Sequence, residues 1–126
     1  MRLRSIRGTI TGIPYSQNRV RGDPEGPRRW SNAITEQTRR LPEIHGPCIL
    51  RVTFLLPASH FPADHPFGND LDNLLKRFCD ALQQTVLSHA PGKDGAIVCL
   101  EAAKAKVNSD EEAGAQFELI EIEATQ

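Results

Sequence analysis

The 126-residue chain has no long apolar run, and this absence excludes one class of protein at once. Its longest apolar stretch, from Cys48 to Leu56, is broken by Arg51, whereas a membrane-spanning helix needs about 20 apolar residues. The first residues also lack the apolar segment of a secretion signal, because arginines interrupt them. We therefore expect no membrane association and a cytoplasmic location.

Cysteine is scarce. Only Cys48, Cys79 and Cys99 are present, each with apolar neighbours, and none has the spacing of a zinc-binding pair. Three is an odd number, which does not suit a disulfide framework. The pattern predicts reduced thiols in the core of a cytosolic protein.

Lysine is absent from the first 40 residues, which hold nine arginines and three acidic residues, a net charge of +6. Residues 41–126 hold six basic and thirteen acidic residues, a net charge of −7. A basic arm on an acidic body suits an anionic polymer as partner, but it also suits an arm that is neutralised by its own body. The length predicts one domain over residues 1–126.

Hydrophobic periodicity predicts four strands, over residues 2–11, 48–56, 96–107 and 116–124. In the third of these, Ile97, Cys99 and Ala103 are expected on one face. The last two strands are separated by a polar turn and are expected to pair as an antiparallel hairpin. The acidic last strand is expected to be a solvated edge.

Two helices complete the prediction. A short one is expected over residues 29–40, capped near Ser31. In a longer one, Leu71, Leu74 and Phe78 follow helical spacing. This helix either continues to Leu87 or ends early near Gln83, and the early end is favoured because poor helix formers follow. The expected fold is α/β (α+β), a single domain with a mixed sheet of about four strands, one long helix and one short helix.

Two carboxylates flank the start of the long helix. Asp70 or Asn69 is expected at the N-cap, and Asp72 follows in the first turn. The carboxylates of Asp70 and Asp72 converge only if Asp70 is still non-helical, since positions two apart diverge by about 200° within a helix. Two carboxylates about 4 Å apart repel by roughly 4 kcal/mol at an effective dielectric constant near 20, which favours a shared hard cation such as Mg²⁺. The alternative is an ordinary helix start with an Asp72–Lys76 ion pair.

The run DLDNLLKRFCDAL, residues 70–82, resembles the signature D-x-D-N-L-x-K followed by D-A-L of the RusA-type Holliday junction resolvases. The resemblance extends to Asp94, which follows a loop and precedes a strand that carries Lys104. It also includes an early loop in which Asn18 and Arg19 match the family's P-x-S-x-N-R.

The resemblance implies a homodimeric endonuclease that cuts four-way DNA junctions with Mg²⁺ and no small-molecule cofactor. It assigns the metal to Asp70, Asp72 and Asp94 and gives Lys76 a catalytic role beside the phosphate. The DNA-binding residues that we expect are Asn18, Arg19, Arg21, Arg28, Arg29 and Lys104. The alternative is a non-catalytic nucleic-acid-binding or interaction module of the same fold. Trp30 is expected either to stack on an unpaired base or to lie in the core or an interface.

Overall fold

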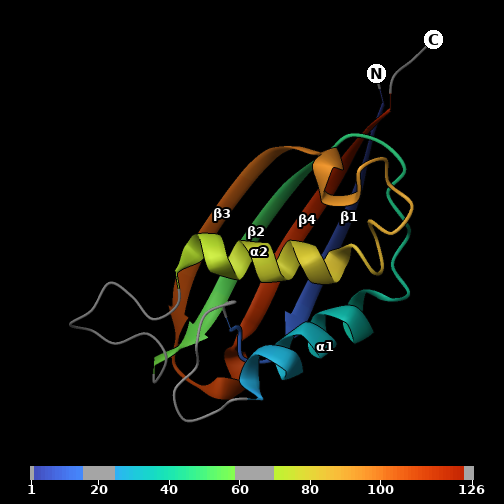
Figure 1. Ribbon diagram of the computed structural model, residues 1–126. Helices are drawn as coiled ribbons and strands as arrows, with labels where there is room; N and C mark the ends of the chain where they lie inside the picture. The colour runs from blue at the N-terminus through green and yellow to red at the C-terminus, as the bar shows by residue number, and fades with distance from the viewer. Residues whose placement is uncertain (1, 16–24, 59–69, 124–126) are drawn as a thin grey trace.

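The computed structural model describes residues 2–15, 25–58 and 70–123, with the side chains of residues 2, 3, 94 and 123 left out. Its elements are β1 (Arg2–Thr11), α1 (Gly26–Thr38), β2 (Cys48–Pro57), α2 (Leu71–Leu82), the 3₁₀ turn η2 (Lys93–Ala96), β3 (Ile97–Val107), the 3₁₀ turn η3 (Asp110–Glu112) and β4 (Gly114–Glu123). Figure 1 shows the four strands side by side, with the helices in front of them.

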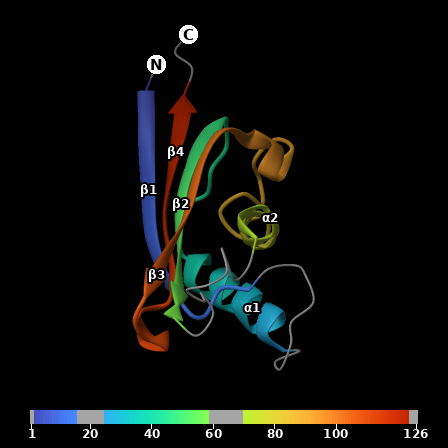
Figure 2. The ribbon, with the colours of Figure 1, turned by 90° about the vertical axis from the view of Figure 1, so that its left-hand side faces the viewer.

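The strands form one mixed sheet in the order β1-β4-β2-β3. β2 and β3 are parallel, while β4 is antiparallel to both of its neighbours, β1 and β2. Both helices cover the same face of the sheet, and the other face carries no helix from the described residues (Figure 2). The fold class is therefore confirmed: a single small α+β domain with a four-stranded mixed sheet and two helices.

The predicted hairpin between the last two strands is wrong. β2 lies between β3 and β4, so these consecutive strands are not neighbours. Because β2, α2 and β3 form a crossover unit, β3 must run parallel to β2. The chain then turns through η3 and β4 enters the interior of the sheet, where Phe117 and Leu119 are buried. The acidic last strand is consequently an interior strand and not the solvated edge that we expected.

The core lies between the sheet and the two helices. The alternation predicted for β2 is confirmed, since Leu50, Val52, Phe54 and Leu56 are all buried. The apolar stripe of α2 covers them. Its Phe78 ring meets the Phe54 ring edge-on at 5.6 Å between centroids and the Phe117 ring at 5.5 Å. Such edge-to-face contacts are favourable for aromatic rings and fix α2 across the sheet.

α2 ends where the prediction favoured, whereas α1 begins earlier than predicted. α2 ends at Leu82 with Gln83 as its C-cap, which confirms the early end. α1 begins at Gly26, before the expected start, and Ser31 lies inside it rather than at its cap. Pro27 stands in its first turn, where proline is favoured because it has no backbone N–H to leave unpaired. The two helices are therefore nearly equal, with 13 and 12 residues.

β3 contains an irregularity that the sequence pattern does not reveal. The pairing register shifts between Cys48 and Ile49, so that Cys48 pairs with Ile97 and Ile49 pairs with Cys99. Ile97 packs against the core, whereas Cys99 is exposed, and the predicted common face of these two residues is wrong. The prediction that all three thiols lie in the core is therefore wrong, since Cys48 is fully buried, Cys79 is half-buried and Cys99 is exposed. An extra residue in one strand reverses the faces that follow, which explains the difference.

Candidate nucleic-acid and metal-binding site

The site that the sequence predicts begins at the N-terminus of α2. Asp70 is the N-cap residue, with an extended backbone at φ −66° and ψ 138°. Its side chain makes no capping hydrogen bond, although a bond of that kind was expected. Its backbone oxygen accepts a hydrogen bond from Leu74 N at 3.0 Å, so the helix begins directly after it. The non-helical backbone that convergence with Asp72 requires is therefore present, and the carboxylate is not used by the helix.

Asp72 lies in the first turn and is exposed. Its Oδ1 accepts a hydrogen bond from the backbone N–H of Asn73 at 3.0 Å. The free N–H groups and the positive end of the helix dipole favour negative charge at this position. Asp72 and Asp70 thus form an exposed acidic pair at one helix end.

Lys76 follows one helical turn after Asp72 and is also exposed. The ordinary interpretation of this spacing is an ion pair between the two side chains. Among the residues that the structure describes, neither Asp70, Asp72 nor Lys76 takes part in an ion pair. Their charges are therefore not neutralised by one another.

The described residues do not bring Asp94, the third predicted metal ligand, next to Asp70 and Asp72. Its backbone lies in η2, beside the second half of α2 in Figure 1, and its side chain is outside the described residues. Ile97, three residues later, lines a common cavity with Cys79. Cys79 is seven residues beyond Asp72, or about 10 Å along a helix. No group of three metal-binding side chains occurs among those described.

The predicted DNA-binding residues have different outcomes. Asn18, Arg19 and Arg21 lie outside the described residues. Lys104 pairs in register with Phe54, whose ring contacts Phe78 of α2, so Lys104 is on the face of the sheet that carries α2. It shares this face with the acidic pair.

The two remaining predicted DNA-binding residues belong to α1. Arg28 is exposed and forms an ion pair with Glu25. Arg29 is exposed too, and it lines a cavity between α1 and the end of β1. Both side chains therefore lie at the N-terminal end of α1.

Much of the basic N-terminal arm is neutralised by the protein itself. Arg4 pairs with the buried Glu121 at 2.6 Å, and Arg7 pairs with Glu118 at 3.1 Å. The hydroxyl of Ser5 donates a hydrogen bond to Glu118, and this contact, together with Arg7, lowers the pKa of that carboxyl group. These pairs form because β4 lies beside β1, which the sequence pattern did not predict.

The sheet face without helices is balanced in charge. Glu118 also lies 3.7 Å from Arg51, and Arg51 pairs with Glu101 at 2.6 Å. With Arg7, these residues form a ladder of alternating charge across all four strands. A surface of alternating charge does not attract a polyanion, so the helical side is the better candidate for a nucleic-acid interface.

Membrane crossing by a helix has no support from the described parts of the chain, where no helix combines sufficient length with sufficient apolarity. A scan of protein-family models finds no match to this chain, and a search of curated proteins finds none either.

Proposed function

We propose that the protein is a Mg²⁺-dependent, structure-selective DNA endonuclease that acts on four-way junctions. The observation that carries the proposal is the start of α2. An extended N-cap Asp70, a first-turn Asp72 and Lys76 one turn later are exposed there, without ion pairs among the described residues. A helix start that served only the fold would more simply use these charges in a cap or an i,i+4 pair.

The donor chemistry of this helix start suits a hard divalent cation. Asp70 and Asp72 offer carboxylate oxygens, the ligands that Mg²⁺ prefers, and their exposure leaves room for the water that Mg²⁺ retains. When bound, Mg²⁺ would supply neutralisation of the phosphodiester oxygens during hydrolysis. Lys76 would contribute a second positive charge beside the scissile phosphate and stabilise the charge that develops there.

The DNA is proposed to lie along the helical side of the molecule. Lys104 shares this side with the acidic pair, and the opposite face is a charge-balanced ladder. The arginines that could hold phosphates there are Arg28 and Arg29 at the start of α1, together with Arg19 and Arg21. We propose a cytoplasmic location as well, where three free cysteines would stay reduced.

The active form is proposed to be a homodimer. The outer edge of β3 has no strand partner among the described residues, and its Val98 and Leu100 are 62% and 48% exposed. Exposed apolar side chains on an unpaired edge are typical of an interface. Within one chain, η2 lies beside the second half of α2, whereas the acidic pair lies at the start of that helix. A two-fold dimer would allow Asp94 of one chain to complete the acidic pair of the other.

A cleavage assay tests the proposal. A synthetic four-way junction is incubated with the protein, with and without Mg²⁺, and with the variant Asp72→Asn. We expect cleavage only with Mg²⁺ and a loss of at least about a hundredfold in Asp72→Asn, because the amide keeps the shape but lowers the charge that holds the cation. The matched control is Asp110→Asn in η3, an exposed acid elsewhere, which should cut normally. Cleavage by Asp72→Asn at the wild-type rate would contradict the metal site.

A non-catalytic nucleic-acid-binding module is the second candidate. The observation that favours it is that β3 starts beside Cys79, seven residues beyond Asp72 on α2. Within one chain, this separates the backbone of Asp94 from Asp70 and Asp72. Junction binding without cleavage in Mg²⁺ or Mn²⁺ would support this candidate over the nuclease.

A further inference from the structure

The second half of β3 carries positive charge on one face of the sheet. Lys104 pairs in register with Phe54 and Lys106 with Leu56, and both partners are fully buried beneath the helices. Because side chains alternate along a strand and residues paired in register share a face, both lysines are on the helical side. Glu101, on the opposite face, belongs to the charge ladder. The alternation of β3 therefore separates lysine from acid.

Lys106 is exposed, and among the residues that the structure describes it takes part in no ion pair. The outer edge of β3 has no strand partner in the same parts of the chain. Lysine on such an edge ordinarily prevents pairing with a strand of another molecule. That protection does not depend on the face that the charge occupies, whereas Lys104 and Lys106 both occupy the helical side. Their common face indicates a second role.

The start of α2 lies on the same side of the molecule as β3. Figure 1 shows α2 crossing the strands with its first residues over β3, and Figure 2, turned by 90°, shows this helix nearly end-on. Asp70 and Asp72 stand at this end of the helix. A phosphate backbone that reaches a cation held by these two acids would therefore pass the outer edge of β3, where the lysine ammonium groups attract it.

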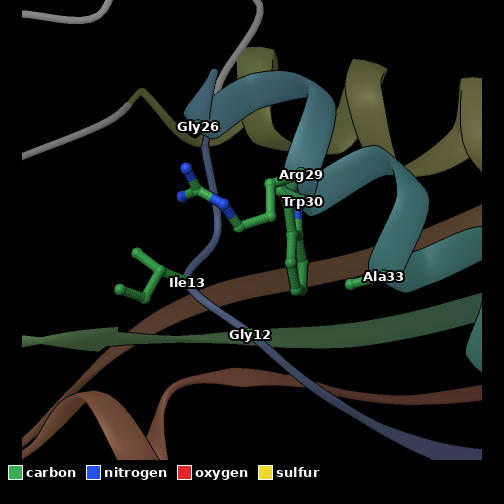
Figure 3. A pocket seen from close by; sticks show the side chains of 6 residues that line it. All are labelled: Gly12, Ile13, Gly26, Arg29, Trp30 and Ala33. Atoms are coloured by element: carbon green, nitrogen blue, oxygen red, sulfur yellow. The ribbon is translucent and has the colours of Figure 1, made fainter. Parts of the chain in front are cut away.

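The start of α1, with its two arginines, lies toward the same end of the sheet as the end of β3 (Figures 1 and 2). Of the two roles expected for Trp30, the core position is confirmed and stacking on a base is excluded, because this residue is only 1% exposed. Figure 3 shows the guanidinium group of Arg29 pointing away from the Trp30 ring. Contacts at this end would therefore reach the phosphate backbone of DNA rather than its bases.

The proposed dimer uses the first half of the same strand. Val98 and Leu100, the exposed apolar residues there, precede Lys104 by at least four residues, or about 13 Å along a strand. Lys106 follows Leu100 by six residues, or about 20 Å. A contact around Val98 and Leu100 thus leaves the lysines at the other end of β3 accessible, and the dimer and DNA do not compete for one surface.

We infer that Lys106 is a further DNA-contacting residue and that, with Lys104, it binds the phosphate backbone of the DNA arm that leads to the metal site. The inference rests on the proposed DNA substrate and adds the path of one arm along the outer edge of β3. The two lysines are two positions apart, or about 7 Å along the strand, so they can meet different phosphates. Because phosphate contacts carry no sequence information, this edge should bind arms of any sequence equally.

Fluorescence anisotropy with a synthetic four-way junction, in EDTA and at several salt concentrations, tests the inference. Lys106→Gln should weaken binding about fivefold at about 0.1 M salt and reduce, by about 1, the slope of the logarithm of the association constant against the logarithm of the salt concentration. Combined with Lys104→Gln, it should reduce the slope by about 2. Lys106→Arg keeps the charge and should keep the wild-type slope.

The matched control is Arg40→Gln. It also removes one exposed positive charge that has no ion pair among the described residues, but it lies beyond the C-terminal end of α1, away from Arg28 and Arg29. Its affinity should stay within about twofold of wild type. If Lys106→Gln is not folded by circular dichroism, Lys106→Thr, which favours a strand, takes its place with the same expected loss.

The outcomes separate this inference from the nuclease proposal. A wild-type slope in the double lysine variant, or an equal loss in Arg40→Gln, refutes the lysine contacts while cleavage is unaffected. Self-association of the double variant in sedimentation, with unchanged affinity of its soluble fraction, shows that the lysines only protect the edge and refutes the inference as well. If Lys106→Gln binds less tightly and the wild type does not cut in Mg²⁺, the contacts stand and the nuclease proposal fails. No junction binding by the wild type refutes both.

Discussion

Arg77 on α2 donates a hydrogen bond to Ser31 Oγ on α1 at 2.7 Å, and a second to the backbone oxygen of Pro27 at 3.1 Å. The serine that appeared from the sequence to cap α1 thus serves as an acceptor between the helices. These bonds connect the helix that carries Asp72 with the helix that carries Arg29. The proposed metal site and the proposed phosphate-binding arginines of α1 are therefore on directly linked elements.

The first prediction concerns this link. Arg77→Met should lower the free energy of unfolding by about 2 kcal/mol, because a partly buried hydrogen bond from a charged donor contributes about 1.5–3 kcal/mol. Ser31→Ala should cost less, and the double variant should show coupling of about 1 kcal/mol. Denaturant unfolding measures all three. Lys76→Met, an exposed neighbour on α2, should stay within about 0.5 kcal/mol of wild type, and additive single effects would contradict the link.

The second prediction distinguishes a site shared between two chains from a site within one chain. Asp72→Asn and Asp94→Asn are unfolded together and refolded as mixed dimers. In a shared site, half of the dimers regain one of two sites, so about a quarter of the wild-type nicking should return. Asp70→Asn mixed with Asp72→Asn is the control and should recover nothing, because both acids are expected in the same half of the site. Absence of recovery in both mixtures would favour Asp94 acting within its own chain.

The third prediction concerns salt. If Arg28 and Arg29 contact phosphates, the affinity for the junction should fall steeply as the salt concentration rises. Replacing either arginine by Gln should then reduce, by about 1, the slope of the logarithm of the association constant against the logarithm of the salt concentration. Arg51→Gln is the matched control, since Arg51 belongs to the charge-balanced ladder on the opposite face. Fluorescence anisotropy in EDTA at several salt concentrations measures the slopes. Equal slopes for all variants would place the DNA elsewhere.

The fourth prediction concerns the outer edge of β3. Leu100→Asp should convert a dimer of two 14.0 kDa chains into monomers, because it puts a charge into the proposed apolar contact. Sedimentation velocity measures the change. Glu111→Lys in η3 is the control for an altered charge at an exposed position. A wild-type monomer that still cuts both junction strands in concert would refute the dimer.

The fifth prediction concerns Cys48. Burial, with a smaller effect of the Glu121 carboxylate, raises the pKa of this thiol from 9.0 to about 11. The folded protein therefore disfavours the thiolate. The contribution of this thiol to the free energy of unfolding is fully present below pH 9 and is lost as the pH rises toward 11. In Cys48→Ala this alkaline loss should be smaller, which thermal melts across that range measure.

The same burial protects Cys48 from alkylation. Since the thiolate is the nucleophile, iodoacetamide at pH 8 should modify the exposed Cys99 well before Cys48, as peptide mass spectrometry can show. In denaturant the two rates should become similar. Equal rates in the native protein would contradict the burial of Cys48.

The parts of the fold that the sequence predicted are those set by local periodicity. Apolar residues recur about every two positions in β1 and β2 and about every 3.6 positions in α2. Such a repeat can be recognised in a single sequence, and it predicted the bounds of β1, the buried alternation of β2 and the apolar stripe of α2. The acidic pair with Lys76 could be found for the same reason. Asp70, Asp72 and Lys76 occupy consecutive turns of a single helix start, so their relative positions follow from helix geometry.

The remaining features depend on contacts between distant segments. The periodicity does not predict that β4 lies between β1 and β2. This strand order creates the Arg4–Glu121 and Arg7–Glu118 ion pairs. The shift at Ile97 likewise arises from pairing with Cys48 in another strand. Sequence alone determined which residues form strands, helices and the acidic helix start, because neighbours along the chain decide these. Only the tertiary structure decided strand order, the neutralisation of the basic arm and the backbone position of Asp94, because non-local packing decides those.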